Sequence, residues 1–153
     1  MRLLILRHAE AVPGADHDPD RPLTSRGTLQ AQAMCRQLQD VLGDYRLLCS
    51  PWMRAHTTAA QLMSGEHEPS SSVSLIPSAS LQAAAGLLES QFDDQSPLVV
   101  VTHQPLCGRL IHWLTEGRDQ GLLIAPCSGA LLELDWPAAG MARLVRWLDA
   151  NPT

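Results

Sequence analysis

The sequence predicts an α/β protein: a three-layer α/β/α sandwich with a mostly parallel central sheet and an antiparallel C-terminal hairpin at one edge. Two apolar runs, residues 3–6 and 98–101, are typical of strands buried on both faces of a parallel sheet. Segments in which apolar residues recur at helical spacing lie between and after these runs. Two alternating segments at the end, residues 130–135 and 142–147, predict the hairpin.

The remaining elements alternate along the chain. Ser50 and Pro51 favour a helix start, with Ser50 as the N-cap and Pro51 at the first helical position. Gly43 is a typical residue to end the helix before them. The expected helices are 28–42, 52–63, 79–92 and 104–115, and the further expected strands are 46–49 and 73–76.

Length and composition narrow the class of protein. A chain of 153 residues is the size of one domain, and we expect residues 1–153 to form a single domain. A net charge of −5 argues against general nucleic-acid binding, which relies on basic surface. No apolar stretch is long enough for a membrane span or a signal peptide. Four scattered cysteines, outside metal-ligand spacing, are expected to be reduced thiols of a cytoplasmic protein: Cys35, Cys49, Cys107 and Cys127.

Basic side chains follow the predicted strands. Arg7 and His8 come directly after the first apolar run, His103 follows the run at 98–101, and Arg54 lies in the first turn of the helix after Ser50. The carboxyl ends of parallel strands meet at one edge, so these side chains should converge. An arginine in the first turn opposes the helix dipole, which suggests a role other than helix stability. With two helix N-termini at the same edge, the arrangement suits a phosphoryl group.

The expected chemistry follows from these residue types. Arg7 and Arg54 can each offer a planar fork to phosphate oxygens. His8 is the expected nucleophile, because a neighbouring cation disfavours protonation of its ring and leaves a lone pair for attack on phosphorus. His103 is expected to donate to a phosphate oxygen, as an imidazolium when the dianion is bound. This chemistry requires neither a metal nor a cofactor.

Four segments together resemble one known family. Leu6-Arg-His-Ala9 resembles the R-H-G signature of the histidine phosphatase (phosphoglycerate-mutase-like) superfamily, and Val101-Thr-His103 is similar to its second histidine segment. Ser50-Pro-Trp-Met-Arg-Ala-His-Thr-Thr-Ala59 resembles its S-P-x-x-R-A-x-x-T segment, and Arg21-Pro-Leu-Thr24 with Gly27 its R-P-L-T-x-x-G stretch. The small size and short connections are most similar to the SixA-type phosphohistidine phosphatases.

The resemblance implies that His8 is the phosphorylated nucleophile and that Arg7, Arg54 and His103 bind phosphate, with Arg21 as a further contact. One departure is Ala9 in place of the glycine of the signature, which costs some backbone freedom. The other is the absence of a carboxylate in residues 77–86, where relatives that cleave phosphate esters place a general acid. Aspartates of the first loop could supply that acid: Asp16, Asp18 and Asp20.

An imidazole leaves more readily than an alkoxide, so the missing acid favours phosphohistidine on a protein, such as a phosphotransfer domain, as the substrate. We expect a shallow, open site, and no nucleic-acid or membrane partner. The alternatives are a small-molecule phosphomonoesterase that uses a first-loop aspartate, and a phosphate-binding module without catalysis. His56 could line the site, whereas three other histidines are expected to be surface or packing residues: His17, His67 and His112.

Overall fold

A six-stranded sheet forms the middle layer of the computed structural model, which describes residues 1–14, 16–63, 65 and 68–150. Neighbouring strands follow the order β3-β2-β4-β1-β5-β6. The first four of these are parallel to one another, whereas β5 is antiparallel to β1 and β6 to β5. The expected sheet with a C-terminal edge hairpin is therefore confirmed. The strands are β1 (Arg2–Arg7), β2 (Arg46–Cys49), β3 (Ser70–Ser71), β4 (Leu98–Thr102), β5 (Ser128–Leu134) and β6 (Ala142–Asp149).

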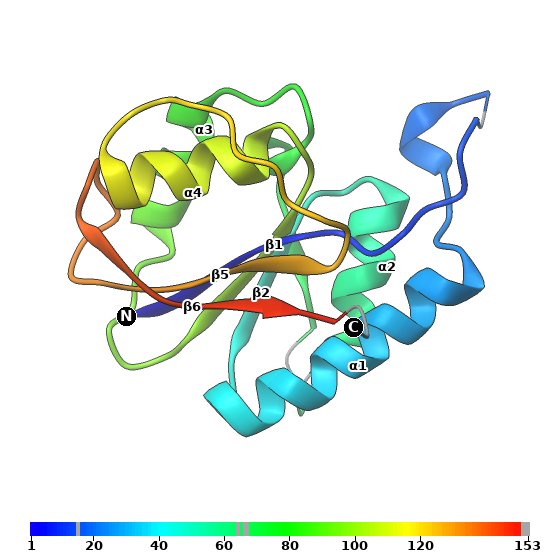
Figure 1. The fold of residues 1–153 in the computed structure, drawn as a ribbon, viewed down its shortest axis with the longest axis horizontal. Coiled ribbons are helices and arrows are strands. Elements are labelled where there is room, and N and C mark those ends of the chain that lie inside the picture. Colours follow the sequence, from blue (N-terminus) through cyan, green and yellow to red (C-terminus); the bar gives the residue numbers. More distant parts are fainter. Residues whose placement is uncertain (15, 64, 66–67, 151–153) are drawn as a thin grey trace.

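Helices cover both faces of the sheet (Figure 1). Side chains alternate along β1, so that Leu4 and Leu6 pack toward α1 (Ser25–Leu42) and α2 (Met53–Gln61). Leu3 and Ile5 pack in the opposite layer, toward α3 (Leu81–Ser90) and α4 (Leu106–Glu116). Two separate apolar cores result, one on each face, and the three-layer sandwich is confirmed.

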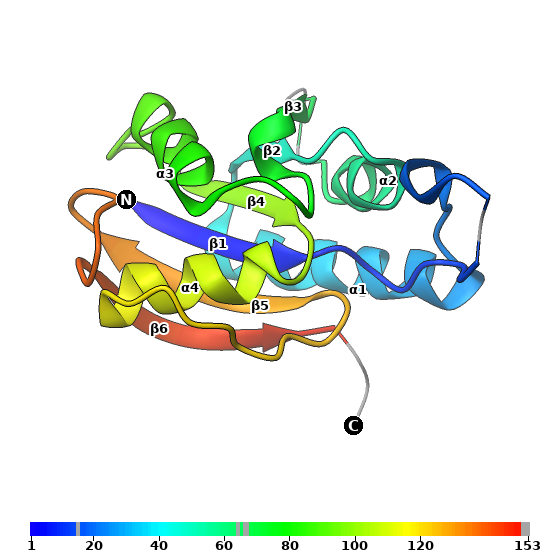
Figure 2. The ribbon, with the colours of Figure 1, turned by 90° about the horizontal axis from the view of Figure 1, so that it is seen from above.

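The strand register places the ends of three strands side by side. Arg7 pairs with Thr102 across β1 and β4, so the next residues, His8 and His103, emerge together. Cys49 of β2 pairs with Val101, which brings Ser50 to the same edge. Beyond this edge, the loop after β1 carries a short 3₁₀ helix, η1 (Asp18–Asp20), beside α2 (Figure 2).

The prediction of a strand at 73–76 is wrong. Residues Val73–Leu75 form a 3₁₀ turn, η2, which starts where the Ser72 hydroxyl accepts the N–H of Ser74 (3.1 Å). Leu75 is buried and its carbonyl accepts the Thr102 hydroxyl (2.7 Å), whereas Val73 is 71% exposed. The strand that pairs with β2 is the two-residue β3 just before this turn.

Helix starts also differ from expectation. α1 begins at Ser25, three residues earlier than predicted. Thr24 caps it by accepting the N–H of Gly27 (2.9 Å). Ser50 is not the N-cap of α2, because the helix begins at Met53 with Trp52 as its cap residue. The other helix boundaries move by about two residues, as is usual at helix ends. Within the described ranges no helix is long and apolar enough to cross a membrane.

Candidate active site

A cavity of about 330 Å³ lies at the carboxyl ends of the parallel strands, and all five predicted phosphate-site residues line it. Its floor is buried, since His8, Arg54 and His103 are 6%, 3% and 1% exposed. Its rim is exposed, because the side chain of Asp18 is 55% accessible. The expectation of a shallow, open site stays a prediction. The five residues come from four parts of the chain: Arg7 and His8, Arg21, Arg54, and His103.

The ring of His8 is held in one orientation. Its backbone N–H donates to Thr102 O (3.0 Å), and Nδ1 lies 2.7 Å from Ala9 O. A carbonyl oxygen only accepts, so Nδ1 carries the proton and Nε2 keeps its lone pair. That lone pair faces Nε of Arg54 at 3.3 Å. Burial, aided by the charges of Arg54 and Arg7, lowers the pKa of His8 to about 4, so the ring is neutral near pH 7.

His103 is held by Ser50. Nε2 of His103 lies 2.8 Å from Ser50 Oγ, which also accepts the N–H of Trp52 (3.2 Å). With the Ser50 hydroxyl donating to Nε2, the ring proton of His103 lies on Nδ1. Nδ1 is buried and has no hydrogen-bond partner among the described residues. Burial, then the charges of His8 and the arginines, lowers the pKa of His103 to about 2, so the ring by itself is neutral near pH 7. Its expected protonation beside a bound dianion stays a prediction.

Two arginines line the cavity floor. Arg7 donates through one terminal nitrogen to Ile124 O (2.8 Å), while its Nε is buried without a partner among the described residues. The Arg54 guanidinium lies over the Trp52 ring, 4.9 Å from its centroid, and contacts His8. Burial lowers the pKa of both guanidiniums, which nevertheless stay charged. The first-turn position of Arg54, unfavourable for the helix, is explained by these contacts.

Thr58 ties the loop that follows His8 to α2. Its hydroxyl accepts the N–H of Ala9 (3.0 Å) and donates to Arg54 O (2.7 Å). Ala9 is fully buried, and among the described non-glycine residues only Cys127 has a positive φ. The glycine of the R-H-G signature is therefore not needed here for backbone conformation.

The first-loop aspartates differ in position. Asp18 lines the cavity and bonds to Arg21 (Oδ1 to Nε, 2.7 Å), whereas Asp16 and Asp20 are not among the residues that line it. Desolvation would raise the pKa of Asp18, but the hydrogen bonds and charges of Arg21 and Arg54 outweigh it and hold this pKa below its ordinary value. Asp18 is therefore ionised, which disfavours it as a general acid.

The helix starts offer fewer free donors than expected. At α2 the N–H of Trp52 is bonded to Ser50 Oγ. At α4 the N–H of Cys107 donates to His103 O (2.7 Å) and that of Gly108 to Gln104 Oε1 (2.8 Å). Positive charge for an anion therefore comes chiefly from the arginines.

The other described histidines lie outside the cavity lining. His56 is exposed on α2 and does not line the cavity. His17 is exposed and bonds to Asp20 (2.9 Å), and His112 lies on α4. His67 falls outside the described residues.

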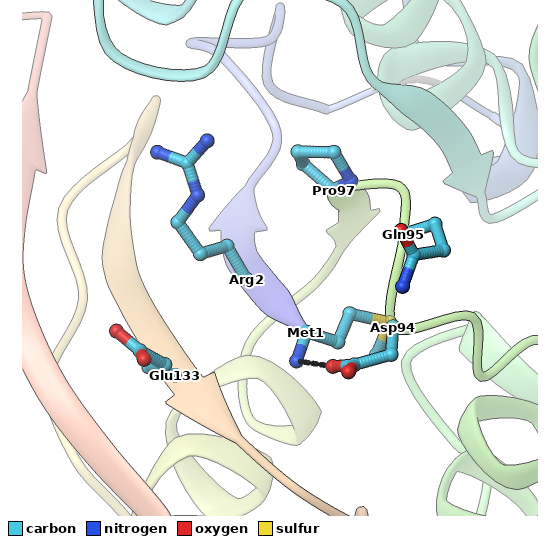
Figure 3. A pocket seen from close by; sticks show the side chains of 6 residues that line it. All are labelled: Met1, Arg2, Asp94, Gln95, Pro97 and Glu133. Carbon is cyan, nitrogen blue, oxygen red and sulfur yellow. Dashed lines mark hydrogen bonds and ion pairs between the residues drawn. The ribbon is translucent and has the colours of Figure 1, made fainter.

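A second cavity lies at the opposite end of β1, around the amino terminus (Figure 3). The amino group of Met1 donates to Asp94 Oδ1 (2.7 Å) and Leu134 O (2.8 Å). Arg2 donates to Val41 O (3.0 Å), and Glu133 pairs with Arg143 (2.9 Å). Its charged groups are paired with the protein itself, so it carries no comparable chemistry.

Comparison with known proteins identifies the family. Residues 3–75 match the model of the histidine phosphatase superfamily (branch 1), a range that includes Arg7, His8 and Arg54. An uncharacterized protein of Picosynechococcus sp. (strain PCC 7002) is 37% identical over 124 residues, which cover 77% of this chain and 75% of that one. The chain belongs to the histidine phosphatase superfamily. Phosphohistidine phosphatase SixA of Escherichia coli (strain K12) is 28% identical over 123 residues, 76% of each chain. A solved structure of the protein histidine phosphatase SixA complexed with tungstate has the same fold, with a TM-score of 0.86 and 22% identity over 98% of this chain and 97% of that one.

Two residues of this histidine phosphatase site were not predicted. Glu10 lines the cavity two residues after His8, and its Oε1 accepts the Thr24 hydroxyl (3.1 Å). Its place just beyond the end of the first strand could have indicated it. The contact of Ser50 with His103 was not predicted, because Ser50-Pro51 also fits a helix start. The contact depends on the register between β2 and β4, which a local pattern does not reveal.

Proposed function

We propose that this histidine phosphatase is a cytoplasmic protein phosphohistidine phosphatase that forms a covalent phosphohistidine on His8. The observation that carries the proposal is the fixed orientation of His8, with Nδ1 bonded to Ala9 O (2.7 Å) and the Nε2 lone pair beside Arg54 (3.3 Å). Two buried nitrogens of cavity residues, Arg7 Nε and His103 Nδ1, have no hydrogen-bond partner among the described residues. Buried polar groups are normally hydrogen-bonded, so these two nitrogens support the binding of an anion in the cavity. The four free cysteines fit a reducing compartment.

In the proposed mechanism, His8 Nε2 attacks phosphorus as the bond to the substrate's imidazole breaks. Phosphoryl transfer has a loose transition state with charge on the equatorial oxygens, which Arg7, Arg54 and His103 would stabilise, with Arg21 as a further contact. Water then attacks the phosphorus on His8, the P–N electron pair returns to Nε2, and phosphate leaves. No external acid is required in either step.

The state of Asp18 supports a phosphoramidate rather than an ester. An alkoxide leaving group needs a proton from a positioned acid, which is typically worth about 10²- to 10⁴-fold in rate. Asp18 is the first-loop aspartate that lines the cavity, and Arg21 and Arg54 keep its pKa low. An imidazole leaving group makes no such demand. The 28% identity to phosphohistidine phosphatase SixA of Escherichia coli points the same way.

A small-molecule phosphomonoesterase is the second candidate, and Glu10 is the observation that favours it. Glu10 lines the cavity, and a carboxyl group is the type of side chain that protonates an alkoxide leaving group. Turnover of an alkyl phosphate that Glu10→Gln abolishes would support this candidate. No turnover of alkyl phosphates by the wild type would exclude it.

The decisive experiment measures phosphate release from a histidine-phosphorylated phosphotransfer domain and, in parallel, from a panel of phosphorylated metabolites. We expect release from the protein substrate, loss of that release in His8→Ala, and an acid-labile phosphoenzyme in the wild type. His56→Ala is the matched control, since His56 is exposed on α2 outside the cavity. A metabolite turned over with much higher kcat/KM than the protein would refute the proposed substrate class, and the absence of any phosphoenzyme would refute the nucleophile.

A further inference from the structure

A carboxylate lies inside the proposed phosphate site. Asp18 Oδ1 accepts a hydrogen bond from Arg21 Nε (2.7 Å), and Oδ2 lies 3.5 Å from a terminal nitrogen of Arg54. Another terminal nitrogen of Arg54 donates to the backbone carbonyl of Asp18 (2.8 Å). The Asp18 side chain is 55% exposed and lines the cavity, so a ligand in the cavity can reach it.

This carboxylate opposes the binding of a simple phosphate. It carries a negative charge and occupies two arginines that would otherwise face the anion. Its low pKa also prevents it from protonating a leaving group. An acceptor in this position is favourable when the substrate brings a donor or a positive charge of its own.

The Arg54 guanidinium lies between the nucleophile and this carboxylate. Its Nε is 3.3 Å from His8 Nε2, while its terminal nitrogens contact Asp18. In-line transfer places the leaving group on the side of phosphorus away from His8. With the phosphoryl group held by Arg54, a leaving group on the side away from His8 can reach Asp18, which lines the cavity and is exposed.

We propose that the Asp18 carboxylate accepts a hydrogen bond from the N–H of the substrate's protonated imidazole, and so selects phosphorylated imidazoles over phosphate esters. The inference rests on the proposed phosphohistidine phosphatase function and names the residue that sets its substrate class. A charge-assisted hydrogen bond of this kind is about twice as strong as a neutral one.

The step balances without a further reactant. The substrate ring carries the phosphoryl group on one nitrogen and a proton on the other, and it donates that proton to Asp18 throughout. As the His8 Nε2–P bond forms, the substrate P–N bond breaks and its electron pair returns to the leaving nitrogen. The substrate imidazole becomes neutral and His8 takes up the positive charge, with its own proton still on Nδ1.

The test compares two small substrates with the purified full chain. N-phosphoimidazole has a leaving group that can be protonated, whereas the leaving group of p-nitrophenyl phosphate has no N–H. In Asp18→Asn we expect the ratio of kcat/KM for phosphoimidazole to that for the aryl ester to fall by at least about tenfold. Inorganic phosphate should inhibit this variant more strongly than the wild type, because a negative charge has been removed.

Two further variants sharpen the result. Asp20→Asn is the matched control, because Asp20 lies in the same 3₁₀ helix and bonds to His17 (2.9 Å) outside the cavity. Its ratio should equal that of the wild type. Asp18→Glu retains the charge and should recover part of the ratio, which a purely structural role in positioning the arginines would not do.

The outcomes separate the two proposals. An equal change in kcat/KM for both substrates in Asp18→Asn would overturn the selectivity role and leave Asp18 as a residue that only positions Arg21 and Arg54. A wild type that releases phosphate from metabolites but from no phosphoramidate would overturn the proposed function itself. A wild type active on phosphoramidates with an unchanged ratio in Asp18→Asn would overturn this inference alone.

Discussion

At the scale of single residues, hydrogen bonds rather than residue types decide what each histidine can do. His8 donates a hydrogen bond from Nδ1 to Ala9 O (2.7 Å), so the lone pair on Nε2 is available to attack phosphorus. His103 meets the Ser50 hydroxyl through Nε2, so Nδ1 can donate (2.8 Å). Both neutral rings thus carry their proton on Nδ1, but His8 bonds to the protein through Nδ1 and His103 through Nε2. The two ring centroids lie 5.1 Å apart.

Ser50→Ala tests this tautomer argument. Loss of the hydroxyl frees the His103 ring to rotate and to change tautomer, and we expect kcat to fall by about tenfold, the size expected for one hydrogen bond. Phosphoenzyme formation, measured by rapid quench, is the readout. Ser80→Ala is the control, because Ser80 caps α3 by accepting the N–H of Ala83 (3.0 Å) and its loss should affect stability alone. Unchanged kcat in Ser50→Ala would contradict the argument.

The sequence predicted residues that line the candidate site but not their hydrogen bonds. Arg7, His8, Arg54 and His103 follow strand ends or a helix start, positions that local patterns reveal. The Ser50 contact depends on the pairing of β2 with β4, and the Asp18 contact on the path of an irregular loop. Neither is encoded by a local period, so neither could be read from the sequence.

At the scale of elements, α1 fixes the segment after His8. A Cβ added to Gly27 would overlap the carbonyl oxygen of Glu10, so only glycine permits this close approach. The backbone N–H of Thr24 also donates to that carbonyl (3.0 Å). The glycine of the R-P-L-T-x-x-G stretch is thus explained by contact with the residues that follow His8.

Gly27→Ala should therefore be destabilising and less active. We expect the free energy of unfolding to fall by about 1–3 kcal/mol through overpacking, together with a loss of kcat/KM. Urea unfolding and p-nitrophenyl phosphate turnover measure the two effects. Gly86→Ala is the matched control, since a Cβ there has no atom within 4 Å and alanine should stabilise α3 by about 0.5–1 kcal/mol. A Gly27→Ala variant as stable as the wild type would refute the packing argument.

Helices and strands were predictable where burial produces a clear apolar run or a clear helical spacing. The runs that became β1 and β4 are continuous and fully apolar, and α4 repeats apolar residues at helical spacing. The segment Val73–Leu75 has strand-like composition, but its carbonyl at Leu75 is taken by a side chain, the Thr102 hydroxyl (2.7 Å), rather than by a neighbouring strand. Tertiary contacts of this kind override local propensity.

At the scale of the whole molecule, stability should pass through a maximum between about pH 6.5 and 9. The buried histidines His8 and His103 have pKa values of about 4 and 2, far below the ordinary 6.5. The unfolded chain therefore binds more protons than the folded one below pH 6.5, and stability falls as the pH falls. Burial raises the pKa of three thiols to about 11 or 12, those of Cys49, Cys107 and Cys127. Above about pH 9 these thiols ionise in the unfolded chain before they do so in the folded one, so stability falls as the pH rises.

Urea unfolding followed by circular dichroism at pH 5, 7.5 and 10 measures both limbs. We expect a loss of about 1.5–2 kcal/mol per buried thiol at pH 10, since each ionises chiefly in the unfolded chain. Cys49→Ala removes one such thiol and should show a smaller loss between pH 7.5 and 10 than the wild type. His103→Asn should likewise show a smaller loss between pH 7.5 and 5. Losses equal to those of the wild type in both variants would mean that other groups control the pH dependence, because the number of protons bound by each state fixes the slope.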